Sequence, residues 1–215
     1  MSAIVTTAPE VPLALLFVAA QAVDIGWALL IAAGVEQVRI VPGFTAASPL
    51  DLHYMPYTHS LPAALAWAVA VAALAAACLP KLRTRRAVVT IGAVVFSHWL
   101  LDWVVHVPDL PLWGNTHKVG LGLWNHFAAA TVLECALFVG AAWWLDAAAR
   151  AGRVTLRRRG LWIFVVTMTV LFVLSLFGPP PPSLTALWVS ALSMYVLMAA
   201  VAGWVDRIRR GTAAP

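Results

Sequence analysis

The chain has 215 residues, of which 62% are hydrophobic and only 11% are charged. Together with a mean hydropathy of +0.88, these values exclude an ordinary water-soluble domain and indicate a protein that spans a membrane. The formal net charge of +5 does not indicate a nucleic-acid partner, because the basic residues lie between apolar stretches and no basic surface interleaved with aromatic side chains accompanies them.

Six apolar stretches are long enough to cross a bilayer, which takes about 20 residues of helix. The sequence therefore predicts an all-α fold, a polytopic membrane helix bundle of about six transmembrane helices that forms a single domain over residues 1–215. In chain order the expected spans are 11–33, 60–79, 87–106, 123–146, 161–177 and 184–206. The first stretch has neither a basic region before it nor a clear cleavage site of small residues, so we expect it to be retained as a span.

The basic residues indicate the orientation of the bundle. Twelve of the 14 Lys and Arg residues lie in three clusters, which follow spans two, four and six. Because loops rich in Lys and Arg stay in the cytoplasm, we expect the three clusters and both termini there, in a multi-pass protein of the inner (plasma) membrane. The opposite, outer side then carries only Arg39 and Lys118. The clusters are Lys81, Arg83, Arg85 and Arg86; Arg150, Arg153, Arg157, Arg158 and Arg159; and Arg207, Arg209 and Arg210.

Two connecting segments on the predicted outer side contain histidines. Segment 34–59 is long for a connection in a small bundle, and we expect it to fold over the outer end as a lid. Segment 107–122 contains His117, which lies beside polar residues and is expected to be solvated. All six histidines of the chain fall in the outer half of this arrangement, so the candidate chemistry lies on one side.

Four side chains at the outer end of span three form the pattern H-x3-D-x3-H-x2-D. The steps of 4, 4 and 3 residues return to nearly the same angle on a helix, so the four are expected to share one stripe. Histidine and aspartate bind metals and move protons, and ionisable groups inside a membrane tend to face a bundle interior or a wet cavity. The stripe therefore predicts a functional site, with a polar network that only holds the helices together as the alternative. The four residues are His98, Asp102, His106 and Asp109.

Residues of two other spans reach a similar depth. His59 begins span two, and Asp24 in span one lies about as far below the outer surface as His98, counted at about 1.5 Å of rise per residue. A pocket open to the outside can therefore gather side chains from three spans. These side chains are Asp24, His59, His98, Asp102 and His106. Further candidates, in the outer segments or deeper in span four, are His53, His126 and Glu134.

The motifs resemble those of a known family. A Tyr-Thr-His-Ser element, residues 57–60, opens span two, and the sequence SHWLLD, residues 97–102, lies in span three. This pair resembles the T-H-S and H-x3-D elements of the predicted membrane-bound, metal-dependent hydrolases, which are small multi-span proteins of the inner membrane. Segments 105–112 and 118–125 look like a distant subgroup labelled only hypothetical membrane protein or permease. The similarity covers roughly residues 51–125.

This resemblance implies a divalent metal, with zinc as the first choice, and hydrolysis of a phosphoester or a similar bond. Carried over position by position, it marks His59, His98 and Asp102 as ligands. The chain departs from the family in one place, because residues 55–57 are Met-Pro-Tyr where His-Arg-Gly often precedes T-H-S.

Coordination chemistry supports a site for zinc or another first-row metal. Imidazoles and carboxylates at i, i+4 spacing can ligate such an ion from one helical face. The ligands that we expect are His59, His98, Asp102 and His106. The spare carboxylates Asp109 and Asp24 are expected to act in catalysis, as general base or by orienting a ligand histidine.

Functions of three classes fit these features. The first is a metal-dependent hydrolase that acts at the outer face on a lipid-like or small ester or phosphoester, because no segment is long enough for a soluble domain that binds a large polar substrate. The second is a transporter that conducts protons or metal ions, and the third is a non-catalytic subunit with a structural metal. Ligands confined to the outer half favour the hydrolase, since a transporter also needs polar groups through the inner half. The expected partners are the lipid bilayer and a lipid or small molecule, and the sequence predicts no oligomeric state.

Overall fold

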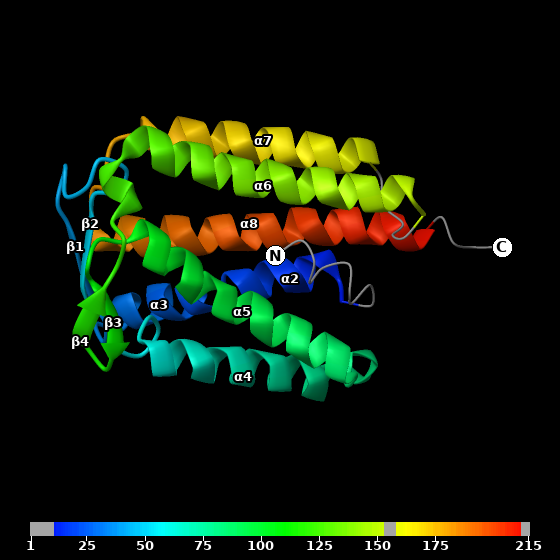
Figure 1. Cartoon of the computed structure of the whole chain (residues 1–215), viewed down its shortest axis with the longest axis horizontal. Coiled ribbons are helices and arrows are strands. Elements are labelled where there is room, and N and C mark those ends of the chain that lie inside the picture. The colour runs from blue at the N-terminus through cyan, green and yellow to red at the C-terminus, as the bar shows by residue number, and fades with distance from the viewer. Residues whose placement is uncertain (1–10, 153–157, 212–215) are drawn as a thin grey trace.

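The computed structural model describes residues 11–152 and 158–211, and this part of the chain contains seven α-helices. They run roughly along the long axis, with α2 and α3 end to end (Figure 1). The protein is 68% helical, which confirms the predicted all-α class. The helices are α2 (Leu13–Ala20), α3 (Ala22–Ala32), α4 (Leu61–Cys78), α5 (Arg85–Val105), α6 (Phe127–Arg150), α7 (Arg158–Leu176) and α8 (Leu184–Gly211).

Five of these helices, α4 to α8, are long and apolar enough to cross a membrane. The pair α2–α3 passes the same test when its two helices are taken together, and it then forms a sixth span. The described helices therefore have the lengths and composition of a multi-span membrane bundle, in the order that the hydropathy of the sequence predicts.

The predicted boundaries move most at α6 and α8. Helix α6 begins at Phe127 rather than at residue 123, because Leu123–Asn125 form a separate 3-10 turn, η2. The chain enters this turn through Gly122, whose φ of 72° is in the left-handed region that favours glycine. Helix α8 continues to Gly211, beyond the predicted end of span six at residue 206.

The first span is bent by 50° between α2 and α3. Neither proline nor glycine lies at the bend, which is centred on Gln21. Instead, the carbonyl oxygen of Ala20 accepts a hydrogen bond from Nδ1 of His98 on α5, at 3.1 Å. A side chain that enters the backbone hydrogen-bond ladder is a known cause of such a bend. The bend is therefore linked to the position of His98, one of the predicted ligands.

Helices α4 and α5 form an antiparallel pair that brings His59 beside His98. The contact face of α4 consists of buried alanines, Ala64, Ala68, Ala72 and Ala75, and small residues let two membrane helices approach closely. At its start, Ser60 caps α4 by accepting the Ala63 N–H and donates its own hydroxyl to the carbonyl of Pro56. His59 is thereby fixed directly before the helix.

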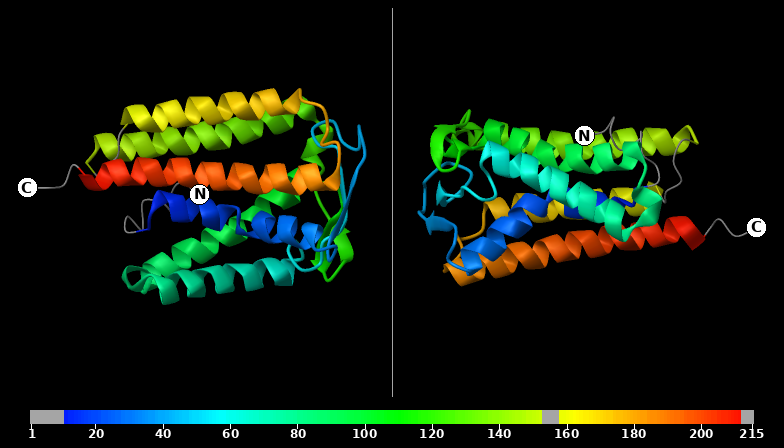
Figure 2. Two further views of the ribbon diagram at one scale, coloured as in Figure 1. Left: turned by 180° about the vertical axis from the view of Figure 1, so that it is seen from behind. Right: turned by 90° about the horizontal axis from the view of Figure 1, so that it is seen from below.

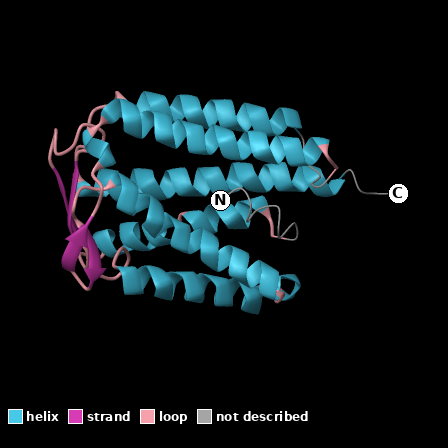
Figure 3. Cartoon of the chain, in the orientation of Figure 1, coloured by secondary structure: helices cyan, strands magenta, loops and turns pink. Residues whose placement is uncertain are grey.

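Two short antiparallel hairpins, which the sequence did not predict, cover one end of the bundle (Figure 3). They consist of β1 (Gln37–Ile40) with β2 (Leu50–Tyr54), and of β3 (Leu110–Trp113) with β4 (Thr116–Val119). The carbonyl of His53 joins them, since it accepts hydrogen bonds from Lys118 Nζ at 2.7 Å and from Asn115 Nδ2 at 3.2 Å. Segment 34–59 thus folds over the end of the bundle, where the sequence predicted a lid.

The basic clusters lie at the opposite end, as the three views of Figures 1 and 2 show. This end holds the α4–α5 connection, the end of α6, the start of α7 and the end of α8. Buried Asp146 of α6 forms ion pairs there with Arg150, at 2.9 Å, and with Arg158. Arg153 and Arg157 fall outside the described residues. The separation of the basic clusters from the hairpins is the arrangement that the predicted orientation requires.

Cysteine labelling on intact cells tests this orientation. In a background without Cys78 and Cys135, the variant His117→Cys on β4 should react with a membrane-impermeant thiol reagent, and Arg85→Cys at the start of α5 should react only after the cells are opened. Both positions are exposed, so access to the reagent decides the result. Labelling of Arg85→Cys but not of His117→Cys on intact cells would reverse the orientation.

Candidate metal centre

Three histidines from neighbouring segments turn their Nε2 atoms toward the same two carboxylates. His98 Nε2 lies 3.2 Å from Oδ2 of Asp102, one helical turn further along α5, and 3.4 Å from Oδ1 of Asp24 on α3. His59 Nε2 lies 3.5 Å from the same Asp24 oxygen and 3.7 Å from the same Asp102 oxygen. His106 Nε2 lies 4.0 Å from the other oxygen of Asp102. We call these five residues the His–Asp cluster.

The cluster contains the geometry of a metal site. Asp24, His59 and His98 each offer one ligand atom, and these atoms all lie within 4.8 Å of one another. Asp102 is central, because its two oxygens lie within 4.0 Å of the Nε2 atoms of all three histidines. The structure therefore brings together the four predicted ligands and Asp24.

Each histidine is held through its other ring nitrogen, Nδ1. The partners are the carbonyl of Ala20 for His98, at 3.1 Å, the hydroxyl of Thr58 for His59, at 2.7 Å, and a carboxylate oxygen of Asp109 for His106, at 2.9 Å. Two of these acceptors, a carbonyl and a carboxylate, require a proton on Nδ1, and in the neutral ring Nε2 then carries a lone pair. Histidines that bind metals are oriented in this way by a second partner.

Thr58 also accepts a hydrogen bond from a histidine Nδ1–H, because its own hydroxyl proton is taken by Glu36. Glu36 is a buried residue between α3 and β1. Glu36 accepts the Thr58 hydroxyl proton at 2.6 Å, and also the backbone N–H groups of Tyr57 and Thr58 at 2.7 and 3.1 Å. Since the hydroxyl proton points to Glu36, the Thr58 oxygen accepts from Nδ1–H of His59. The carboxylate thus orients His59 through Thr58.

Two atoms at the centre of the cluster are left without a hydrogen bond. Among the described residues, His98 Nε2 and Asp102 Oδ2 are buried, and although they lie 3.2 Å apart, neither makes a hydrogen bond with good geometry. Buried polar atoms without a partner are costly and rare in native structures. A divalent cation satisfies both atoms and balances the charges of the two aspartates, so the residues present fit a metal.

Aromatic and phenolic groups enclose the cluster. The Trp99 indole donates to the carbonyl of His59 at 2.9 Å, and the Trp124 ring lies against His106 with the ring centres 4.5 Å apart. The Tyr195 hydroxyl of α8 donates to the second oxygen of Asp24 at 3.3 Å. The cluster is therefore held from α8 as well as from α3, α4 and α5.

Exposure differs within the cluster. The side chains of His59 and His106 are only 5% and 3% exposed, whereas that of Asp24 is 25% exposed. His98 and Asp102 are each 13% exposed. The cluster is therefore most open at Asp24, and less so at His98 and Asp102.

The predicted helical stripe holds only in part. Helix α5 ends at Val105, so His98 and Asp102 share its face but His106 and Asp109 lie beyond it. Pro108 explains the end, because the residue before a proline disfavours helical geometry. His106 still reaches the cluster, and Asp109 turns back to hold its ring.

Gly120 and the residues after it fix this turn. A side-chain carbon on Gly120 would collide with the backbone carbonyls of His106 and Val107. Close passage allows the N–H of Gly122 to donate to the His106 carbonyl at 2.6 Å, and that of Leu121 to the Trp103 carbonyl at 2.8 Å. The segment after β4 thus anchors the end of α5.

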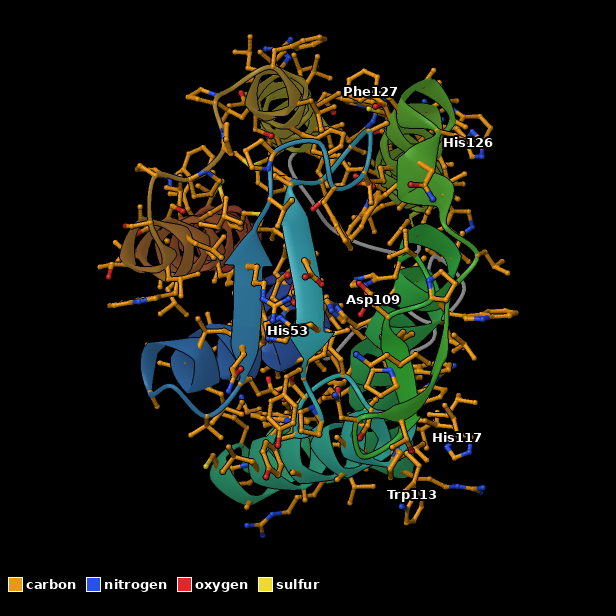
Figure 4. All side chains as sticks on the ribbon, turned by 90° about the vertical axis from the view of Figure 1, so that its left-hand side faces the viewer. His53, Asp109, Trp113, His117, His126 and Phe127 are labelled. Atoms are coloured by element: carbon orange, nitrogen blue, oxygen red, sulfur yellow. The ribbon has the colours of Figure 1, made fainter. Side chains whose placement is uncertain are left out.

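Three further candidates lie apart from the cluster. His53 is on β2, where its ring lies 3.4 Å from the side chain of Gln37. His126 and His117 are both exposed, and in the view onto the hairpin end they lie at the edge of the molecule (Figure 4). Glu134 of α6 accepts a hydrogen bond from the Trp124 indole at 3.3 Å, so it lies behind the tryptophan that covers His106.

Sequence reasoning missed Glu36, Thr58 and Tyr195 as supports of the cluster. For Thr58 the sequence did offer a signal, because this residue is part of the T-H-S element. Glu36 and Tyr195 are single polar residues without a periodic pattern, and their partners lie 22 and 171 residues away in the chain.

Comparisons with known proteins add no relative. No protein-family model, no curated protein and no solved structure matches this chain.

The metal content of purified protein tests the cluster. Protein purified without chelators should contain a stoichiometric divalent ion, and His98→Ala should lose it because a central ligand is removed. The control His126→Ala removes an exposed imidazole and should retain the ion. Elemental analysis measures both, and equal metal content in the two variants would contradict the assignment.

A substitution at Thr58 tests whether this residue orients His59 for metal binding. Thr58→Val removes the acceptor of Nδ1–H while keeping the shape of the side chain, and it should weaken metal affinity by roughly 10–100-fold. The matched control is Thr116→Val, because Thr116 contacts Nδ1 of His117 at 2.9 Å in an exposed Thr-His pair. Competition with a chromogenic chelator gives the affinities, and an equal effect of both substitutions would refute the role of Thr58.

Proposed function

We propose that this chain is a membrane metalloenzyme that hydrolyses an ester or phosphoester bond of a lipid-like or small substrate. The observation that carries the proposal is the convergence of three oriented histidines on two carboxylates inside an apolar bundle. The resemblance of the T-H-S and H-x3-D elements to the membrane-bound, metal-dependent hydrolases supports the same reaction class.

Zinc fits the donor set best. Catalytic zinc is commonly held by three protein ligands drawn from His, Asp and Glu, with one position left for water or substrate. His59, His98, His106 and Asp102 supply such donors, and Asp102 is the better carboxylate ligand because it lies near all three histidines. A divalent ion bound there supplies Lewis acidity that polarises the substrate oxygen and activates water.

Asp24 is then the group that moves a proton. It faces His59 and His98, it is the most exposed member of the cluster, and Tyr195 holds its second oxygen. A carboxylate in this position can accept a proton from the attacking water as general base. The water oxygen bonds to the carbonyl carbon or phosphorus, and the leaving oxygen takes up the proton from Asp24. Tyr195 orients the carboxylate during this transfer.

The remaining carboxylates have positioning roles. Asp109 contacts only the Nδ1 side of His106 within the cluster, so it orients that ring rather than facing the reacting atoms. Glu36 does the same for His59 through Thr58. Loss of such a partner weakens metal binding without removing a ligand.

The proposed orientation places the cluster at the outer face of the inner membrane. The cluster lies next to the hairpin end, and the basic clusters at the other end are expected in the cytoplasm. An ion or proton path would have to continue from the cluster to the basic end, and the adjoining cavity described below has a mostly apolar wall. Transport is therefore the alternative that the test must separate.

Hydrolysis by purified protein in detergent micelles tests the proposal. Chromogenic p-nitrophenyl esters and phosphodiesters should be cleaved, a chelator should abolish cleavage, and added zinc should restore it. Asp24→Asn should lower kcat by about 10²–10⁴-fold, the usual contribution of a general base. Glu134→Gln should lose far less, because Glu134 lies behind Trp124.

The same variants in reconstituted vesicles address transport. A flux of protons or metal ions that depends on the ion gradient, with equal losses in Asp24→Asn, Asp102→Asn and Glu134→Gln and with no hydrolysis, would overturn the proposal. Hydrolysis without flux is the expected result.

A further inference from the structure

A cavity of about 290 Å³ lies beside the His–Asp cluster, between α2, α5, α6 and α7. His98 forms part of its wall, together with Ser97 and Gln21. The other lining side chains are almost all apolar, and they include Phe17 of α2, Phe138 of α6 and Phe164 of α7. One member of the candidate metal centre thus borders an apolar space inside the bundle.

The cavity extends from the cluster toward the basic end. His98 lies in the half of α5 nearest the hairpins, whereas Leu161, another lining residue, lies at the start of α7 near the basic end. In the proposed orientation it therefore runs from His98, in the outer half of the bundle, toward the cytoplasmic end. A lipid of the outer leaflet has the same polarity, with its head group outside and its chain pointing inward.

The hairpin end gives little access to the cluster. Val38, Leu52, Met55 and Leu110 of the hairpin segments are buried in an apolar cluster that also contains Trp27 and Trp99. The ligands nearest this cover, His59 and His106, are almost fully enclosed. The exposed part of the cluster belongs to Asp24, His98 and Asp102, and of these three His98 lines the cavity.

The size and chemistry of the cavity suit a hydrocarbon. An engineered apolar cavity of about 150 Å³ stays dry and binds benzene, and this one has about twice that volume. Its walls are parts of membrane-spanning helices, so hydrocarbon chains surround the protein at high concentration. A chain that enters the cavity exchanges contacts with other lipid chains for van der Waals contacts with the apolar and aromatic walls.

We propose that this cavity holds the hydrocarbon chain of the substrate, so that the bond to be cleaved lies against His98 and Asp24. The substrate is then an amphipathic lipid with an alkyl or acyl chain rather than a small polar solute. Cleavage of that lipid rests on the proposed function, whereas binding of the chain can be measured without it.

Photolabelling tests chain binding directly. The probe is a lysophospholipid with a diazirine at the end of its acyl chain, added to the protein in micelles with and without zinc. Mass spectrometry should locate labels on cavity residues such as Phe138 and Phe164. Ala141→Trp fills the cavity from α6 and should largely abolish this labelling, because the indole ring occupies the space of the chain. The control Ala136→Trp adds the same ring at an exposed position of α6 and should change nothing.

A second variant keeps the test decisive if Ala141→Trp does not fold. Phe138→Ala enlarges the cavity and should shift the preferred competitor in a series of alkyl phosphates toward longer chains. Metal content and helical content check that each variant is folded. Labels spread equally over the lipid-facing surface, with no effect of either cavity variant, would overturn the inference.

The two proposals fail in distinguishable ways. Specific labelling without hydrolysis of any ester or phosphoester would leave the chain site standing and refute the enzyme. Hydrolysis whose rate is independent of chain length, and is unchanged in a folded Ala141→Trp variant, would refute the chain site and leave the enzyme standing.

Discussion

Three imidazoles, each fixed through Nδ1, turn their Nε2 atoms toward two aspartates in the interior of an apolar bundle. Charged groups are expensive in such surroundings unless they are paired. The lone pairs and carboxylates face one another, and two of the central atoms lack a hydrogen bond. A divalent cation stabilises this arrangement, because it binds the lone pairs of the imidazoles and balances the negative charge of the aspartates. The rest of the structure can be understood as the support of this centre.

Several local features of the fold serve that support. The 50° bend between α2 and α3 presents the Ala20 carbonyl to His98 and carries Asp24 to the centre. The Ser60 cap fixes His59, and the close passage at Gly120 fixes the end of α5 where His106 lies. The hairpins close the aqueous end, so the cavity beside His98 becomes the approach to the site. The proposed metal binding, access and substrate class therefore all rest on one geometry.

Hydropathy predicted the spans well, because each span is a property of about 20 consecutive residues. The cluster could also be predicted from the sequence, since His98 and Asp102 are one helical turn apart and His59 begins a span. Local rules could not predict the bend, which depends on a side chain 78 residues away and not on proline or glycine. They also missed the strands of four or five residues, and they extended the stripe to Asp109 although Pro108 ends the helix earlier.

X-ray absorption at the metal K-edge of the purified, zinc-loaded protein tests the central claim most directly. The account predicts a first shell of nitrogen and oxygen only, with the outer-shell scattering of several imidazoles, and a loss of imidazole scattering in His106→Ala. The two cysteines, Cys78 and Cys135, lie outside the cluster, so they should not contribute. A first shell that contains sulfur, or a spectrum without imidazole scattering, would contradict the account.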